Sequence, residues 1–156
     1  MEILVMGRAA AIQYCRQKHS ASAAIVSISD PNMVYTSEPY ITRGNGVSAI
    51  LSLSFCDADE PGKDVYGHET DGRDLMSDEA AMRVARFVKE HTNERLIIHC
   101  DAGISRSAGV AAAISKHCIG YDDEYFYSCR YRPNMWCYRK TLTALASLAD
   151  CTQDSV

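Results

Sequence analysis

Four short apolar runs along the chain end at glycine, proline or polar residues, and this pattern predicts buried strands. The runs cover residues 3–6, 24–29, 47–55 and 96–99. Gly7 closes the first run, and Asp30 with Pro31 stops the second. Short runs with turn residues on both sides are typical of strands in a parallel sheet whose two faces are covered.

Helical patterns separate these strands. An apolar stripe with the i, i+3, i+4, i+7 spacing lies before the fourth strand, and Ser77 precedes it as a candidate N-cap. A helix is expected over residues 105–118, and its residues 110–114 are apolar on every side, which predicts a central, buried helix. Further helices are expected over residues 9–16, from about residue 122, and after Asn134.

The alternation of strands and helices predicts an α/β fold. We expect a single domain over residues 1–150, with a mainly parallel sheet of four to five strands and helices on both faces. Residues 151–156 are expected to form a frayed tail. Two connections, over residues 30–46 and 56–76, are longer than ordinary loops and are typical of binding loops or lids.

Composition excludes several classes of protein. The net charge of -4 argues against a nucleic-acid or membrane-surface partner, because such proteins usually carry a basic face. No apolar run has the length of a membrane span, and the first residues do not form an export signal. Seven cysteines without a C-x-x-C pair indicate free thiols and no structural zinc. We therefore expect a cytoplasmic protein without metal or other cofactor; the oligomeric state stays open.

The segment from His99 to Ser107 carries the candidate chemistry. Cys100 ends a strand, Gly103 lies inside the following loop, and Arg106 stands where the buried helix begins. Such a loop directs its backbone N–H groups inward, and the helix dipole adds positive potential at the same place. The segment therefore predicts a phosphate cradle made of Asp101, Ala102, Gly103, Ile104, Ser105 and Arg106.

Three side chains in this segment have predicted roles. Arg106 can offer a planar fork of donors to two phosphate oxygens. The loop amides, the dipole and Arg106 favour a thiolate at Cys100, which would be a nucleophile toward a bound phosphate. Ser107 could donate a hydrogen bond to the sulfur when it leaves. The plainer alternatives are a buried small hydrophobe at Cys100 and a surface charge at Arg106, although the latter would oppose the helix dipole.

The pattern His-Cys-x-x-Gly-x-x-Arg-Ser resembles the signature of the protein tyrosine phosphatase superfamily, and its spelling is closest to the dual-specificity and small prokaryotic tyrosine phosphatases. The resemblance implies the cysteine phosphatase fold. It also implies the activity of a cysteine-dependent phosphomonoester hydrolase, with a protein tyrosine phosphatase as the first expectation. It also implies a phosphocysteine intermediate on Cys100, with Arg106 holding the phosphate oxygens. An aspartate after an earlier strand would then protonate the leaving oxygen.

The same resemblance directs attention to the segment after residue 55 for the general acid. Asp57 stands at the expected position, and Asp59 is its near rival. Asp57 precedes Cys100 by 43 residues, a longer gap than in most dual-specificity enzymes, and the excess lies in residues 62–74. The acid could therefore also be a later residue of this loop, namely Asp64, Asp71 or Asp74.

Two more residues have predicted supporting roles. His99 is interpreted as a packed residue that orients the Cys100 loop. Asn134 follows Pro133 at the expected start of a helix, which favours an N-cap. An Arg-Pro-x-x-Asn-like stretch in the related phosphatases implies that Asn134 has a supporting role at the rim of the site.

Other functions remain open from the sequence. A sulfurtransferase or an arsenate reductase can also use a cysteine in a short anion-binding loop, and neither requires Asp57. A non-catalytic phosphate-binding module is the third interpretation. The expected substrate is a phosphoprotein or a small phosphomonoester. The acidic residues from 57 to 74 disfavour polyanionic inositol lipids, and the choice between phosphotyrosine and phosphoserine depends on a pocket depth that the sequence does not reveal.

Overall fold

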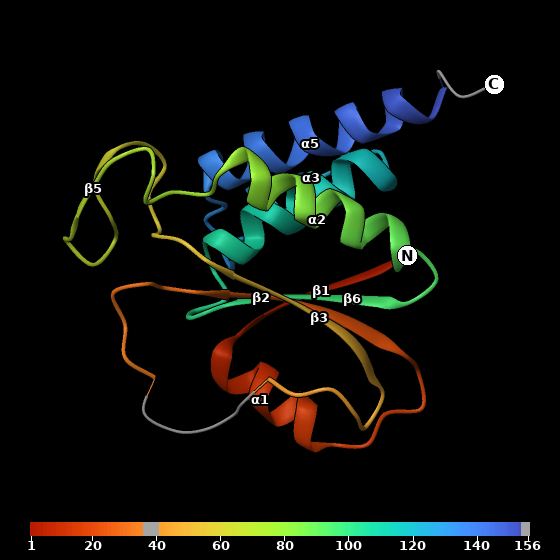
Figure 1. Cartoon of the computed structure of the whole chain (residues 1–156). Coiled ribbons are helices and arrows are strands. Elements are labelled where there is room, and N and C mark those ends of the chain that lie inside the picture. Colours follow the sequence, from red (N-terminus) through yellow and green to blue (C-terminus); the bar gives the residue numbers. More distant parts are fainter. Residues whose placement is uncertain (36–40, 154–156) are drawn as a thin grey trace.

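Four parallel strands form the sheet at the centre of this computed structural model (Figure 1). They are β1 (Glu2–Gly7), β2 (Ala23–Ser29), β3 (Val47–Ser54) and β6 (Arg95–Cys100), in the spatial order β1-β6-β2-β3. The structure describes residues 1–35 and 41–153, with side chains up to residue 149. Residues 36–40 of the long connection and 154–156 of the predicted tail lie outside the described residues.

The two central strands, β6 and β2, are buried, and this burial explains why their sequences are mainly apolar. β6 pairs with β1 on one side and with β2 on the other, so both of its edges and both of its faces are covered. Val26 lies opposite Ile98 in the β2–β6 register, and both side chains are fully buried. β3 is an edge strand and alternates between buried and more exposed positions, as expected for its position in the sheet.

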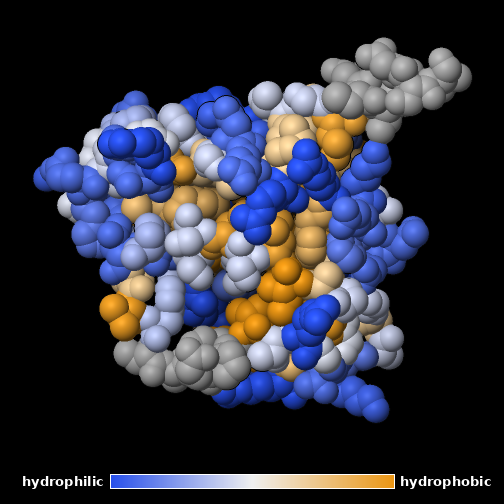
Figure 2. Space-filling model, viewed as in Figure 1, coloured by the Kyte–Doolittle hydropathy of each residue, from blue (hydrophilic) through white to orange (hydrophobic). Residues whose placement is uncertain are grey.

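Helices cover both faces of the sheet, as the sequence predicts. α1 (Arg8–Arg16) lies on one face, and α2 (Asp78–Glu90), α3 (Arg106–Cys118) and α5 (Met135–Gln153) lie on the other (Figure 1). α3 packs between the sheet and α5, and its first ten residues are buried. Figure 2 shows apolar residues gathered in the middle of this view and mainly hydrophilic residues above and below.

Local capping agrees with the predicted start of α2, since Ser77 Oγ accepts a hydrogen bond of 3.0 Å from the backbone N–H of Ala80. A short helix, α4 (Asp123–Tyr127), follows α3. α5 continues to Gln153, beyond the predicted domain end at residue 150, because no glycine or proline interrupts it there. No helix in the described part of the chain is long and apolar enough to cross a membrane.

The long connection before α2 differs from the loop that the sequence predicts. It contains a small antiparallel hairpin made of β4 (Gly62–Lys63) and β5 (Glu69–Thr70). These strands of two residues carry no apolar alternation, so the hydrophobic pattern could not reveal them. The hairpin projects from the edge of the molecule where the central strands end (Figure 1).

Candidate active site

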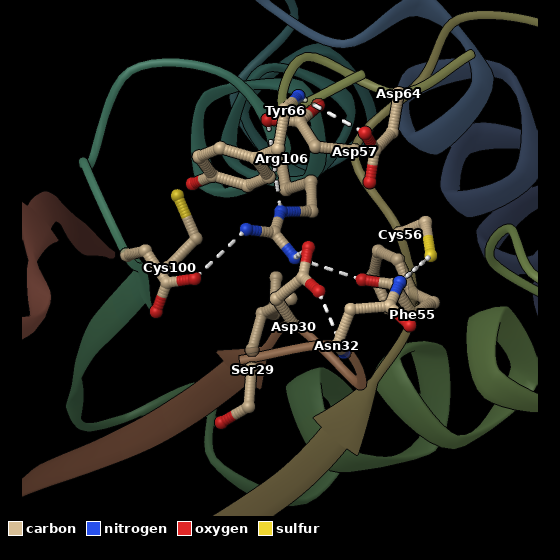
Figure 3. Close-up of polar contacts among 12 residues, drawn as sticks. Ser29, Asp30, Asn32, Phe55, Cys56, Asp57, Asp64, Tyr66, Cys100 and Arg106 are labelled. Carbon is tan, nitrogen blue, oxygen red and sulfur yellow. Dashed lines mark hydrogen bonds and ion pairs between the residues drawn. The ribbon is translucent and has the colours of Figure 1, made fainter. Parts of the chain in front are cut away.

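The carboxyl ends of three neighbouring strands bring the candidate residues together. The Cys100 loop follows β6, Asp30 follows β2, and Asp57 comes shortly after β3. Because these strands are parallel, their ends share one edge of the sheet, which is the usual position of a ligand site in an open α/β sheet. Figure 3 shows the side chains of Asp30 and Asp57 around the guanidinium of Arg106, with Cys100 beside it.

The Cys100 loop curls around the sulfur of Cys100. The backbone N–H of Gly103 donates to Sγ at 3.3 Å, and Ser107 Oγ lies 3.1 Å from the same sulfur. Gly103 has a φ of 72°, and a Cβ at this position would lie only 2.4 Å from the backbone nitrogen of Gly7. A side chain at position 103 is therefore excluded both by conformation and by the close approach of β1.

Arg106 is the central cation of the site and is only 1% exposed. Its Nη1 donates to the carbonyl oxygen of Phe55 at 2.7 Å, and its Nη2 donates to Asp101 Oδ2 at 3.2 Å. Burial lowers the pKa of Arg106, but Asp57, Cys100 and Asp101 outweigh burial and leave that pKa raised. The Nε atom is buried without a hydrogen-bond partner among the described residues, and Asp57 Oδ2 lies 3.7 Å from it.

Asp101, the acidic residue of the cradle, is compensated from the opposite side by α1. Arg8 Nε donates to Asp101 Oδ1 at 3.0 Å, and the Tyr35 hydroxyl donates to the same oxygen at 2.7 Å. Burial raises the pKa of the Asp101 carboxyl, but the hydrogen bonds from Tyr35 and Arg8 outweigh burial and leave the pKa lowered. Asp101 thus stays ionised and links Arg106 to Arg8.

The motif-based prediction missed Arg8 and Tyr35. The guanidinium of Arg8 also lies over the Tyr35 ring, 3.8 Å from its centroid. One signal was present in the sequence, because Arg8 directly precedes the helix expected over residues 9–16, where a cation opposes the dipole and suggests a carboxylate partner elsewhere. Nothing in the sequence pattern marked Tyr35.

The five candidate acids occupy different places. Asp57 is 5% exposed, and its Oδ2 lies 3.7 Å from Arg106 Nε. Asp59 accepts a hydrogen bond of 2.7 Å from the backbone N–H of Met135, at the start of α5. Asp64, Asp71 and Asp74 hydrogen-bond within residues 62–74. Of the five, Asp57 is the one that forms an ion pair with Arg106.

Two polar groups hold the carboxylate of Asp57. Its Oδ1 accepts from Ser105 Oγ at 2.7 Å and from Asn134 Nδ2 at 2.8 Å. Asn134 also caps α5, because its Oδ1 accepts from the backbone N–H of Cys137. A Cβ on Gly109 would lie 2.3 Å from the Asn134 carbonyl oxygen, so the glycine lets this segment approach α3. The capping and supporting roles predicted for Asn134 are thus compatible in one side chain.

With this geometry described, solved structures supply a comparison. No protein-family model matches the chain, and no curated protein matches it. A crystal structure of PTPMT1 has a TM-score of 0.57 and 13% identity, covering 99% of this chain and 96% of that one. The active form of Tk-PTP has a TM-score of 0.51 and 18% identity, covering 96% and 92%. The fold is that of the protein tyrosine phosphatases.

In this phosphatase fold, His99 lies under the Cys100 loop and is fully buried. Its Nε2 lies 2.7 Å from Ser27 Oγ, and its Nδ1 lies 3.3 Å from the carbonyl oxygen of Cys100. Burial lowers the pKa of His99 to about 4. The ring is therefore neutral near neutral pH and connects β6 to β2 through hydrogen bonds.

The buried His99 predicts a pH dependence of stability. Its pKa is about 4 in the folded protein and near 6.5 when the chain unfolds, so the unfolded state binds the proton first. Stability from this group is complete above pH 6.5 and is lost as the pH falls toward 4, by about 3 kcal/mol at most. Urea unfolding at pH 7 and pH 4.5 should show a smaller loss in His99→Asn than in the wild type.

The matched control for this measurement is His117, an exposed residue of α3. His117→Asn should keep the wild-type difference in unfolding free energy between the two pH values. Equal pH dependence in His99→Asn and the wild type would show that His99 does not carry the effect.

One group of side chains beside the site could hold a metal ion. Asp30, Cys56 and Asp64 each offer a ligand atom, and these atoms lie within 4.8 Å of one another. Arg106 Nη1 already lies 3.6 Å from Asp30 Oδ2, and burial together with Asp30 and Asp64 raises the pKa of the Cys56 thiol. A neutral thiol and a neighbouring guanidinium both disfavour a bound cation. A reaction without metal therefore stays a prediction, which is checked by measuring activity with and without a chelator.

Proposed function

We propose that the protein is a cysteine-dependent phosphomonoester hydrolase that acts through a phosphocysteine and without metal. One observation carries the proposal: Cys100, Arg106 and Asp57 meet at one edge of the sheet, with Asp57 Oδ2 3.7 Å from Arg106 Nε. This arrangement offers a nucleophile, an anion-binding cation and an acid to the same ligand. The mechanism needs reduced Cys100, which supports the expected cytoplasmic location.

The first step transfers the phosphoryl group to the enzyme. The Cys100 thiolate attacks phosphorus, so an S–P bond forms while the P–O bond of the ester breaks. The leaving oxygen takes its electron pair and receives a proton from Asp57. The Gly103 N–H, which donates to the sulfur at 3.3 Å, stabilises the thiolate before attack.

The second step releases phosphate. The Asp57 carboxylate accepts a proton from a water molecule, whose oxygen attacks phosphorus as the S–P bond breaks. Ser107 Oγ, 3.1 Å from the sulfur, stabilises the departing thiolate by a hydrogen bond. Ser105 and Asn134 keep Asp57 oriented in both steps. Arg106 binds the oxygens of the transferring group, where negative charge is concentrated.

The position of Asp57 favours hydrolysis over the other chemistries of such loops. Sulfurtransferases and arsenate reductases do not need an acid from the loop after β3, whereas here Asp57 is buried and held by two donors. A module that only binds phosphate has no need of a nucleophile, and Cys100 is present with a donor hydroxyl at its sulfur. These contacts support the enzyme rather than the module.

Phosphotyrosine is the proposed substrate class. PTPMT1 has been crystallised in complex with PI(5)P, with a TM-score of 0.50 and 14% identity to this chain over 84% of it. In this chain, Asp30, Asp57 and Asp101 surround Arg106, so the site has little excess positive charge for a polyanionic headgroup. A phosphotyrosine peptide presents a single phosphate, which fits a site with little excess positive charge better than a polyanionic headgroup does.

Arg106→Lys tests the proposal. A lysine is a point donor and cannot form the planar fork, so hydrolysis of a phosphotyrosine peptide should fall by about 100-fold or more, with weaker phosphate binding. The assay contains a chelator throughout, and wild-type activity should be the same with and without it. A phosphoserine peptide and PI(5)P complete the substrate panel.

The control is Arg83→Lys, because Arg83 is exposed on α2 and contacts only a β3 carbonyl oxygen among the bonds described. Its kinetics should match the wild type. Near-normal kinetics in Arg106→Lys, or activity that disappears with the chelator, would contradict the proposed mechanism.

A further inference from the structure

The hairpin formed by residues 62–70 is joined to the loop that carries Asp57. The backbone N–H of Val65 donates to the Asp57 carbonyl oxygen at 2.9 Å. At the other end of the insertion, the N–H of Cys56 donates to the Asp74 carbonyl oxygen at 2.7 Å. Hydrogen bonds near both ends of this insertion therefore join it to the loop that carries Asp57, next to the candidate active site.

A buried carboxylate shapes the turn of this hairpin. Asp64, whose side chain is fully buried, accepts from the backbone N–H groups of Tyr66 at 3.0 Å and His68 at 2.8 Å. Burial raises the pKa of Asp64, but the hydrogen bonds from His68 and Tyr66 outweigh burial and leave the pKa lowered. The ionised carboxylate thus holds the backbone of residue 66 in one conformation, which directs the Tyr66 side chain.

The Tyr66 side chain extends over the candidate active site. Figure 3 shows it reaching from the hairpin across Arg106 toward Cys100. The charges of Arg106, Asp101 and Asp57 all act on its hydroxyl group, although Asp57 lies in the loop after β3 and Asp101 in the loop after β6. Burial raises the pKa of Tyr66, so the phenol is uncharged at neutral pH. Tyr66 as a whole is still 45% exposed, which leaves surface for contact with a ligand.

Given the phosphatase activity proposed above, we propose that Tyr66 is a specificity-determining residue whose ring contacts the aryl group of a phosphotyrosine substrate. The hairpin then forms a wall that deepens the pocket above the Cys100 loop. In a phosphotyrosine the ring is bonded to the ester oxygen and separates the peptide backbone from phosphorus, so the ring lies at the height of this wall when the phosphate is in the cradle. A phosphoserine carries no ring, and its backbone would meet the hairpin before its phosphate reached the cradle.

The ring, rather than the hydroxyl group, is responsible for the contact. An aromatic pair strengthens binding beyond the effect of the area that it buries, and most of this gain remains when Tyr is replaced by Phe. The site charges that surround the hydroxyl are already engaged with Arg106 or Arg8. Tyr66→Phe should therefore resemble the wild type, and Tyr66→Ala should not.

The experiment measures peptide binding to Cys100→Ser and turnover by the otherwise wild-type protein. In the Cys100→Ser background, Tyr66→Ala should weaken binding of a phosphotyrosine peptide by about 3- to 10-fold. Binding of inorganic phosphate and of a phosphoserine peptide of the same sequence should stay unchanged. In turnover, the loss should appear mainly in KM. Tyr66→Phe and Val65→Ala, the latter an exposed neighbour, are the matched controls.

Four outcomes would overturn the proposal. Equal losses for both peptides, or weaker phosphate binding, would show that Tyr66 acts through the hairpin on Asp57 or on the cradle. Gains for both peptides would show that the ring covers the pocket. A full loss in Tyr66→Phe would assign the effect to the hydroxyl group. The proposed activity fails separately, if the wild type hydrolyses no phosphomonoester at all.

Discussion

Cys100→Ser is expected to reduce hydrolysis of aryl phosphates by about 10⁴-fold or more, because a serine hydroxyl in this loop is not ionised and no other nucleophile replaces the thiolate. Binding of inorganic phosphate should persist, since the Gly103 amide and the Arg106 guanidinium remain. Steady-state kinetics with an aryl phosphate and calorimetry with phosphate measure the two effects in the same protein preparation.

A second cysteine serves as the control for this substitution. Cys129 is free and exposed, so Cys129→Ser should leave both turnover and phosphate binding unchanged. Activity that survives in Cys100→Ser would contradict the phosphocysteine mechanism. Loss of turnover together with loss of phosphate binding would indicate a damaged loop, and a melting curve compared with the wild type distinguishes damage from chemistry.

Asp57→Asn should show an effect that depends on the leaving group. A phenol with a very acidic hydroxyl group leaves without protonation, whereas tyrosine, with a pKa of about 10, needs the proton. We expect a loss of about 10³-fold for a phosphotyrosine peptide and only a small loss for the activated aryl phosphate. The basic limb of the pH–rate profile should also flatten, because that limb reports deprotonation of the acid.

Asp59→Asn is the matched control, since Asp59 faces the first turn of α5 and makes no ion pair with Arg106 among the described contacts. Its loss should be small and the same for both substrates, as should that of Asp71→Asn. If Asp57→Asn is nearly silent and a later aspartate of the insertion shows both effects, Asp57 is not the acid. Losses that are equal for both substrates in Asp57→Asn would assign it a structural role instead.

Local patterns were sufficient to predict the elements that depend on neighbours in the sequence. The apolar runs became the four strands, because each strand is buried on both faces or along one face and its composition reflects that burial. Residues 110–114 of α3, which are apolar on every side, are buried between the sheet and α5 for the same reason. The cradle could also be predicted, because a strand, a glycine and a helix start within a few residues form it locally.

Other features depend on contacts between distant residues. Arg8 compensates Asp101 across 93 positions, and Asn134 holds Asp57 across 77. Hydrophobic periodicity reveals neither pair, because each pair forms only when the folded sheet or α5 brings two distant segments of the backbone together. The choice among five candidate acids likewise required the path of the chain after β3.

The sequence by itself therefore determined the sheet, the covering helices and the identity of the Cys100 loop, since burial and backbone conformation act over short stretches of chain. The tertiary structure decided which aspartate lies beside Arg106, which residues neutralise Asp101, and where the inserted hairpin points. Those features depend on electrostatic and hydrogen-bond partners that only folding brings within about 3 to 4 Å of one another.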